Sequence, residues 1–559
     1  MLIRLITGAI LILSSVLAGC APDSAPRFDI LISGGTVIDG SGEPRTVADV
    51  GIVDDTIAAV GSFSDAVAER TIDATGLIVA PGVIDIHGHS DYSLLVDGTA
   101  QSKIRQGVTT EIIGEALSAG PISTSGRNFK RVEAPLWDTA ISWNTLGEYF
   151  DVLQGKGISL NIGSFVGSMS VRRYVIGDTN RRATTEEIDS MATLVDEAMR
   201  QGAQGVASAL LGSPITTEEL IAMARAASHH GGIYSTHVRD EGSLIFPSLD
   251  EAFRVAREAD IAVDVIHLKV AERALWGRMD SVLARFESAR AEGIDATANM
   301  YPYIAGQNDL AALIPPEGQD GGRQKMLERL ADPAWREKFK KTLYAGGRPD
   351  WYNHYTSSAG WESMLVVSTK AKKNAELVGM RMNEIIEQRG GDPADVLFDL
   401  LLDEGGSVPT VYFLMSEDDV RTALAHPLVS FCSDGVAVRP DGPLGKGKPH
   451  PRWYGSFPRI LGYYARDEAV LSLEEAVHKL SWMNAEKLGI GDRGLIRPGM
   501  AADLMLFNPA SVIDRATFSD PHQYPDGIEY VMVNGTVVID SGSHTCALPG
   551  QIIHGPGKE

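Results

Sequence analysis

The sequence predicts an α/β protein in which a (β/α)₈ TIM-like barrel carries a small β-sandwich domain built from both chain ends, with an insertion after the seventh barrel strand. Two observations lead to this fold. Short apolar runs alternate with amphipathic stretches through the middle of the chain, and short strand-like runs separated by turn residues fill its two ends. With 559 residues, the chain is long enough for one large and one smaller domain.

The two chain ends share one pattern. In residues 28–82, runs such as Phe28–Ser33 are separated by Gly and Asp turns, which indicates an antiparallel sheet. A similar pattern returns in residues 488–545, where Asn534-Gly535 between two apolar runs is a strong hairpin signal. We therefore predict that residues 28–82 and 488–545 form one small β domain.

Residues 83–487 contain apolar runs that suit the buried parallel strands of a barrel. The eight runs are Val83–His87, Val108–Gly114, Ser159–Val166, Gly205–Leu211, Ile233–His237, Ala262–His267, Ile294–Met300 and Leu428–Ser433.

Amphipathic stretches separate most of these runs and predict crossover helices at Thr184–Gln201, Thr217–His230 and Leu249–Ala259. The gap between the seventh and eighth runs is too long for a plain crossover. We therefore predict an insertion at about 306–427, with helices of its own at Gly321–Leu330 and Pro333–Leu343.

The first residues have the features of a signal peptide. Arg4 precedes the apolar stretch Leu5–Leu17, which is short for a membrane span. The stretch ends in Leu17-Ala18-Gly19-Cys20, which resembles the bacterial lipobox, where the cysteine carries the lipid. We predict a signal peptide at 1–19 and a lipidated tether at 20–27. An ordinary secretory signal with a chance cysteine is the alternative.

Acyl chains on Cys20 would anchor the protein in the bacterial cell envelope. The next residue is Ala21 rather than Asp, which by the lipoprotein sorting rule favours the outer membrane, facing the periplasm. No later apolar run approaches the length of a membrane span, so the body is expected to be soluble.

Composition narrows the choice of partners. The net charge of −23 argues against nucleic acid as a partner. Besides Cys20, only Cys432 and Cys546 are present, so one disulfide is possible but no disulfide framework is defined. The composition does not indicate an oligomeric state.

Polar side chains recur at the ends of the predicted barrel strands. His87 and His89 follow the first run two residues apart, so on an extended segment they face the same way. His237 ends the fifth run, His267 the sixth, and Asp434 follows the eighth. Active sites of such barrels lie at these strand ends, and imidazole and carboxylate groups bind metals. The sequence therefore predicts a metal centre.

Several motifs beside this constellation resemble the D-aminoacylase (N-acyl-D-amino-acid deacylase) family of the amidohydrolase superfamily, over roughly residues 28–545. The motifs are Pro81-Gly82 to His89, Gln106-Gly-Val-Thr-Thr110, His237-Val-Arg239-Asp240-Glu241, His267-x-Lys269, Tyr301-Pro302-Tyr303, Ser433-Asp434-Gly435, Pro449-His450-Pro451-Arg452-x-Tyr454 and Gly499-Met-Ala-Ala-Asp503.

This resemblance implies zinc-dependent hydrolysis of the amide bond of N-acyl-D-amino acids, or of dipeptides with a C-terminal D-residue. It implies one or two zinc ions. His237 and His267 match the ligands of the tightly held zinc, and His87 and His89 match those of a second, weaker position. Asp434 matches the general base. The positions that hold the substrate carboxylate in the family are matched by Lys269, Tyr301 and Arg452.

The chain departs from the family pattern in three places. The second strand typically ends in Gly-Asn-Cys, whose cysteine is a metal ligand, whereas this chain has Gly114-Glu115-Ala116. We expect Glu115 to replace the thiolate, because a carboxylate can bind or bridge zinc. After the third strand Ser168 replaces a frequent histidine. After the fourth, Gly212 lies where an aromatic residue often occurs, which suggests more room for substrate.

Other functions are weighed against this one. Another amidohydrolase, for example a dipeptidase or a cyclic-amide hydrolase, is the alternative among enzymes. Arg452 favours a free carboxylate over a cyclic imide. A non-catalytic surface lipoprotein is the alternative from another class. The four histidines and Asp434 argue against it, because an unused site has no physical reason to assemble buried charge.

Overall fold

The computed structural model describes residues 25–122, 141–177, 179–348 and 351–559. The predicted signal peptide and Cys20 lie outside these residues. Among the helices that are described, none is both long enough and apolar enough to cross a membrane. Cys432 is buried and Cys546 is exposed, and both are free, so the possible disulfide between them does not form.

Strands from both chain ends form one nine-stranded sheet, in the order β21-β20-β19-β18-β5-β1-β2-β3 with β4 beside β1. The strands are β1 (Arg27–Val37), β2 (Thr46–Val53), β3 (Thr56–Gly61), β4 (Val67–Asp73), β5 (Ile78–Pro81), β18 (Leu504–Phe507), β19 (Ile528–Val533), β20 (Thr536–Asp540) and β21 (Ser543–His544). The antiparallel pair β5–β18 joins the two ends of the chain.

The predicted hairpin is confirmed. Asn534 and Gly535 connect β19 to β20, and their φ angles of 46° and 74° are those that a tight two-residue turn requires. The prediction of a wholly antiparallel sheet is wrong, because β1 pairs in parallel with β4 and with β5. β3 already runs in the same direction as β1, and residues 62–66 bring the chain back beside Arg27, so that β4 and then β5 run parallel to β1.

The middle of the chain supplies parallel strands in two sheets. One has the order β6-β7-β8, and the other β9-β10-β11-β12-β13-β17. These strands are β6 (Val83–Asp85), β7 (Val108–Ile113), β8 (Asn161–Ser164), β9 (Val166–Gly167), β10 (Gly205–Ala209), β11 (Ile233–His237), β12 (Val263–Val265), β13 (Ala296–Met300) and β17 (Val429–Phe431). Each of the eight predicted runs contains one of them.

Only Phe165 separates β8 from β9, so the two sheets meet along one stretch of chain. After β6 and β17, Gly88 and Gly435 form a parallel bridge. The first and last strands of the series therefore approach each other at the ends where the histidines and Asp434 lie.

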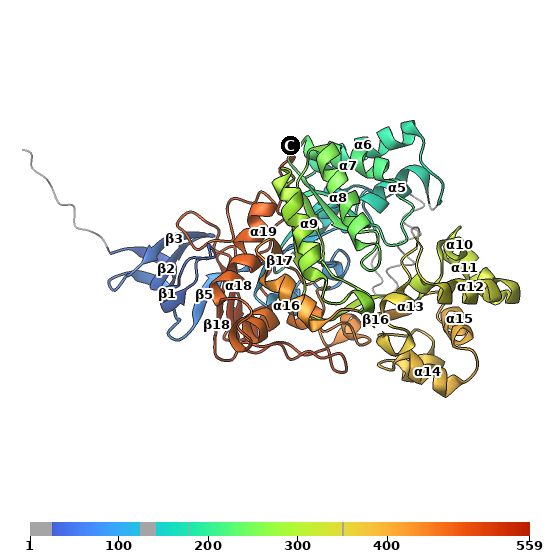
Figure 1. Ribbon diagram of the computed structural model, residues 1–559. Helices are drawn as coiled ribbons and strands as arrows, with labels where there is room; N and C mark the ends of the chain where they lie inside the picture. The colour runs from blue at the N-terminus through green and yellow to red at the C-terminus, as the bar shows by residue number, and fades with distance from the viewer. Residues whose placement is uncertain (1–24, 123–140, 178, 349–350) are drawn as a thin grey trace, which may run out of the picture.

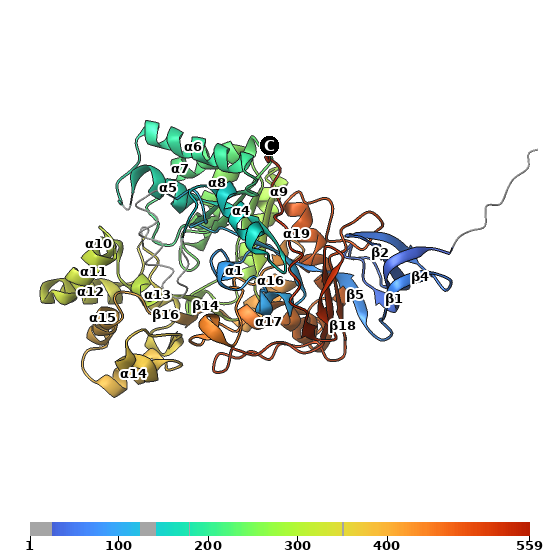
Figure 2. The same ribbon diagram turned by 180° about the vertical axis from the view of Figure 1, so that it is seen from behind.

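Helices follow most of these strands and flank them (Figures 1 and 2). They are α4 (Leu146–Lys156), α5 (Ser168–Ile176), α6 (Thr185–Arg200), α7 (Thr217–Ser228), α8 (Ile245–Ala259), α9 (Met279–Ala291), α16 (Glu417–Ala425), α17 (Arg452–Arg459), α18 (Leu473–Leu480) and α19 (Trp482–Lys487), with short helices α1 (Ser93–Val96) and α2 (Gln101–Ile104) near the first strands.

The starts of these helices follow from local sequence. Thr184 and Thr216 each form a capping box with a glutamate three residues later, which satisfies the free N–H groups at the starts of α6 and α7. Helix α8 begins at Ile245, four residues before the predicted start. Pro247 lies in its first turn, where a missing N–H breaks no helical hydrogen bond.

The predicted insertion is an antiparallel sheet surrounded by helices. Strands β14 (Ala305–Asp309), β16 (Pro409–Phe413) and β15 (Met364–Val366) pair in this order. The helices are α10 (Pro316–Gln319), α11 (Arg323–Ala331), α12 (Pro333–Ala345), α13 (His354–Ser357), α14 (Met382–Arg389) and α15 (Pro393–Asp403). The insertion lies at the opposite end of the molecule from β1–β3 (Figure 1).

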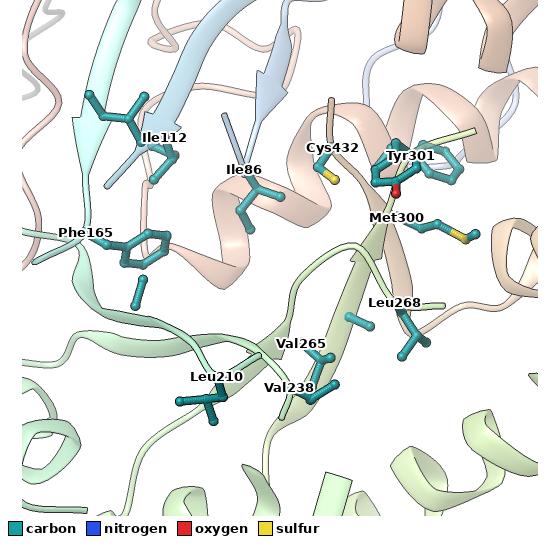
Figure 3. Packing of buried hydrophobic residues seen from close by; sticks show 14 of the residues in the cluster. Ile86, Ile112, Phe165, Leu210, Val238, Val265, Leu268, Met300, Tyr301 and Cys432 are labelled. Carbon is teal, nitrogen blue, oxygen red and sulfur yellow. The ribbon is translucent and has the colours of Figure 1, made fainter. Parts of the chain in front are cut away.

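One hydrophobic cluster includes side chains from consecutive strands and from the loops that follow them (Figure 3). Ile112, Val265 and Met300 belong to β7, β12 and β13. Ile86 directly precedes His87, and Cys432 lies two residues before Asp434. This buried layer therefore holds the backbone that carries the predicted site residues.

Candidate metal centre

The structure brings the four predicted histidines and Asp434 together at the carboxyl ends of the parallel strands. His237 is the last residue of β11, and the others follow β6, β12 and β17 within a few residues. Left-handed φ angles occur at His267 (40°) and at Asp434 (47°). Such angles are uncommon outside glycine and are often found at functional sites. They turn the chain sharply at the point where each side chain enters the site.

Asp434 faces the first pair of histidines. Its Oδ1 lies 3.0 Å from Nε2 of His89 and 3.6 Å from Nε2 of His87. The rings of His237 and His267 lie close by, with centroids 4.3 Å apart, and the His87 and His267 centroids are 5.5 Å apart. The two predicted pairs of ligands therefore form one continuous cluster.

Glu115 lies between the two pairs of histidines. Its Oε2 is 3.4 Å from Nε2 of His87 and 3.3 Å from Nε2 of His89, while its Oε1 is 3.5 Å from Nδ1 of His237. One carboxylate thus presents one oxygen to each pair, which is the arrangement of a bridging ligand. The side chain points into the site, at the place where the family's cysteine is absent.

A bend directly after β7 gives Glu115 this position. Gly114 has φ = 95°, and a Cβ atom there would lie 2.3 Å from the carbonyl oxygen of Phe165. No other residue fits at this point without displacing backbone. The glycine therefore lets β7 pack tightly on the third strand while the next side chain turns inward.

The donors fit a divalent metal. Three overlapping sets each place their donor atoms within 4.8 Å of one another: His87, His267 and Asp434; His87, His89 and Glu115; and Glu115, His237 and His267. Nε2 of His87 is buried and makes no hydrogen bond to any described residue. A buried donor without a partner is costly, and coordination of a metal would satisfy it.

The electrostatics of the site differ from one candidate ligand to the next. Burial and the neighbouring Lys269 hold the pKa of His267 well below its usual range, so its imidazole is neutral. Burial alone would favour the neutral acid of Glu115, but His87 and the hydrogen bond from His237 outweigh it and lower the pKa of Glu115 to about 2. Burial also opposes the charge of His89 and His237, but their carboxylate neighbours outweigh it and raise the pKa of each to about 9. Without a metal these two rings are therefore protonated, and a bound cation would displace a proton from each of them.

The three residues predicted to hold a substrate carboxylate also lie together. Nζ of Lys269 is 5.8 Å, and Cζ of Arg452 is 4.6 Å, from the ring centroid of Tyr301. All three side chains are buried. NH1 of Arg452 lies 2.9 Å from Oδ2 of Asp434. Two cations thus lie beside Tyr301, and one of them pairs with the predicted general base.

The two other departures from the family pattern differ in their surroundings. Ser168 begins α5, and its Oγ is buried with no hydrogen-bond partner among the described residues. Gly212, with φ = 63°, has open space where a Cβ atom would be. It lines a cavity of about 540 Å³ between the loop after β10 and the insertion, together with Asn308, Tyr352 and His354.

Sequence analysis missed a buried ionic cluster beside the centre. Lys103 contacts Asp85 at 2.6 Å, Glu111 at 3.0 Å and Oγ of Ser433 at 2.6 Å. Glu111 lies within the apolar run of β7. A charged residue in such a run indicates a buried ion pair, because a buried carboxylate requires a partner. Glu241 was also missed. Glu241 ends the motif His237-Val-Arg239-Asp240-Glu241, but the sequence alone assigned it no role.

Comparison with known proteins identifies the protein family of this chain. A profile described as the amidohydrolase family matches residues 70–336 and 370–539. The D-aminoacylase of Alcaligenes xylosoxydans xylosoxydans is 36% identical over 537 residues, 95% of this chain and 98% of that enzyme.

Two solved structures agree with this match. A D-aminoacylase structure concerned with its binuclear metal center has a TM-score of 0.78 at 35% identity, covering 94% of this chain and 99% of that one. N-acyl-D-glutamate deacylase from Bordetella bronchiseptica, complexed with zinc and a phosphonate inhibitor, has a TM-score of 0.79 at 27% identity, covering 94% and 100%.

The fold and the site thus define an enzyme that hydrolyses amides. The chain belongs to the amidohydrolase family and, within it, to the D-aminoacylase family. The resemblance drawn from the sequence motifs is therefore confirmed.

Proposed function

We propose that this enzyme hydrolyses the amide bond of N-acyl-D-amino acids, or of dipeptides with a C-terminal D-residue. One observation carries the proposal: the cationic side chains of Lys269 and Arg452 flank Tyr301 directly beside Asp434. A free carboxylate held by these cations would place the adjacent amide at the candidate metal centre. The names of the related deacylases support the same substrate class.

Different residues of the site carry out proton transfer and substrate binding in the proposed reaction. Asp434 accepts a proton from the attacking water and returns it to the nitrogen of the leaving amine. Lys269 and Arg452 hold the substrate carboxylate, and the Tyr301 ring packs between them. A cyclic imide offers no carboxylate to these groups, which disfavours the cyclic-amide hydrolase.

We propose zinc as the metal, in one or two positions. His237 and His267 would hold the first ion and His87 and His89 the second, and Glu115 would be a ligand within reach of both pairs. When bound, such an ion makes water a stronger nucleophile at neutral pH and polarises the amide carbonyl. The nitrogen and oxygen donors of the cluster are those that zinc accepts.

A screen of substrates tests the function. Purified enzyme loaded with zinc is assayed against N-acetyl-D- and N-acetyl-L-amino acids, D-terminal dipeptides and a cyclic amide such as a hydantoin. We expect turnover of the D-substrates only. Turnover restricted to L-substrates or to the cyclic amide would replace the proposal with one of the alternative amidohydrolases, and no turnover at all would favour the non-catalytic lipoprotein.

We also propose that the nine parallel strands, with β8 and β9 counted as one interrupted strand, close into a (β/α)₈ barrel. We propose further that the sheet from the two chain ends folds as a β-sandwich. The Gly88–Gly435 bridge and the short gap between β8 and β9 support the closed barrel. The cavity lined by Gly212, Tyr352 and His354 accepts part of the substrate beyond the amide.

The location of the enzyme is proposed from the sequence alone. Cys20 carries lipid and anchors the protein in the bacterial outer membrane, facing the periplasm. We expect Cys20→Ser to leave the protein in the soluble fraction or unprocessed. Processed protein that stays with the membranes would exclude the lipid anchor.

A further inference from the structure

The segment that follows β11 carries three charged residues whose partners differ. Arg239 donates to both carboxylate oxygens of Glu251 on α8, each at 2.9 Å. Oδ1 of Asp240 accepts from the backbone N–H groups of Gly242 at 2.8 Å and Leu244 at 3.0 Å. These two residues fix the path of the loop. Arg239 and Asp240 make these contacts away from the metal centre. Glu241 is therefore the charged residue of this segment that is directed toward the metal centre.

The carboxylate of Glu241 is buried and meets two functional groups with one oxygen. Its Oε1 lies 3.0 Å from Nε2 of His237 and 2.6 Å from Nζ of Lys269. The same oxygen is 3.5 Å from Nδ1 of His267. The side chains of Glu241 and Lys269 are only 7% and 4% exposed, so these contacts are screened little by water.

The two ring nitrogens of His237 face different partners. Nε2 faces Glu241, and Nδ1 faces Glu115 at 3.5 Å, on the side of the ligand cluster. Glu241 is the closer of the two carboxylates, so with a metal on the Nδ1 side the remaining ring proton would lie on Nε2, toward Glu241. A carboxylate beside the outer ring nitrogen orients a metal-binding histidine and raises its basicity.

We infer that Glu241 is a positioning residue with two tasks: it orients His237 toward the metal and holds Lys269 toward the substrate carboxylate. The second task rests on the proposed function, whereas the first does not. One carboxylate thereby joins the metal centre to the recognition of the substrate. The contact with Ala271, whose N–H donates to the Glu241 carbonyl oxygen at 2.8 Å, fixes the backbone at this point.

Two variants separate the tasks. Glu241→Met removes both interactions. Glu241→Gln keeps the shape and an oxygen that can accept from Nε2 of His237, but it removes the charge opposite Lys269. Glu272→Gln is the matched control. Oε1 of Glu272 accepts a hydrogen bond from Ser243 N at 3.2 Å, in the loop that carries Glu241, and among the described residues Glu272 forms no ion pair with His237 or Lys269.

The first measurement is the zinc dissociation constant of each protein, obtained by competition with a chelator and without turnover. We expect Glu241→Met to bind zinc about 10–100-fold more weakly, Glu241→Gln to lose less, and the control to match the parent. Zinc affinity in Glu241→Met equal to that of the parent would overturn the first task.

The second measurement compares KM for an N-acyl-D-amino acid with KM for the matching amide, which lacks the carboxylate. We expect both Glu241 variants to raise KM for the acid more than KM for the amide. Equal changes for the two substrates would overturn the second task. If the parent turns over no N-acyl-D-amino acid, the second task falls with the proposed function, while the zinc titration still decides the first.

Discussion

Arg452 lies between the predicted base and the predicted place of the substrate carboxylate: its NH1 is 2.9 Å from Oδ2 of Asp434, and its Cζ is 4.6 Å from the ring centroid of Tyr301. The other oxygen of Asp434 faces His89. The two carboxylate oxygens thus have different partners. Burial opposes the charge of Asp434, but Arg452 and the histidines outweigh it and hold the pKa of Asp434 well below its usual range.

This pair predicts a change in the pH profile. In Arg452→Met, the pKa of Asp434 should rise, because the largest influence that lowers it is gone. The carboxylate must be ionised to accept a proton, so the acidic limb of kcat/KM should move to higher pH. KM should also rise, because a buried charged partner of the substrate is lost, at a cost of about 2–5 kcal/mol. Arg459→Met on the same helix is the control, since Arg459 pairs with Asp514. An unmoved acidic limb would contradict the influence of Arg452 on Asp434.

Asp434→Asn tests the base itself. Asparagine keeps the shape of the side chain but cannot take the proton, so kcat should fall by about 10²–10⁴. The protein should stay folded and retain zinc, because His237, His267 and Glu115 remain. Steady-state kinetics and metal analysis on the same sample check both points. A variant with nearly normal kcat would remove Asp434 from the mechanism.

Glu115 lies where the family pattern leads us to expect a cysteine ligand. Glu115→Gln removes the negative charge that offsets the metal, so zinc affinity should fall, and added zinc should partly restore the rate. Glu115→Cys should recreate a thiolate ligand and retain one tight zinc. Metal content after dialysis measures both effects, with the exposed Glu186→Gln as control. Unchanged zinc content in Glu115→Gln would exclude Glu115 as a ligand.

The buried cluster around Lys103 should be essential for stability. Lys103→Met leaves Asp85 and Glu111 buried without their cation, which should lower the free energy of unfolding by about 3–5 kcal/mol. Lys325→Met is the control. Lys325 is 58% exposed and pairs with Glu328 at the surface, so its loss should cost less than about 0.5 kcal/mol. Denaturant unfolding of the metal-free proteins provides the comparison. Equal values for the two variants would show that the buried cluster contributes no more than a surface pair.

The strands and their order along the chain were predictable from sequence. Each of the eight apolar runs contains an observed strand, and the hairpin at Asn534-Gly535 forms as expected. The gathering of His87, His237 and Asp434 was predictable as well, since the carboxyl ends of parallel strands meet at one edge. These features depend on local periodicity, turn chemistry and one general rule of topology.

Other features were decided only by the tertiary structure. Sequence periodicity does not reveal that Arg452 pairs with Asp434, that Glu241 holds both His237 and Lys269, or that β1 runs parallel to β4 and β5. Contacts of this kind depend on sharp backbone turns and on side chains that meet across different loops or strands. A sequence therefore determines which chemical groups reach the strand ends, whereas three-dimensional packing decides which of them touch, because distances of a few ångströms between distant residues are set by the whole fold.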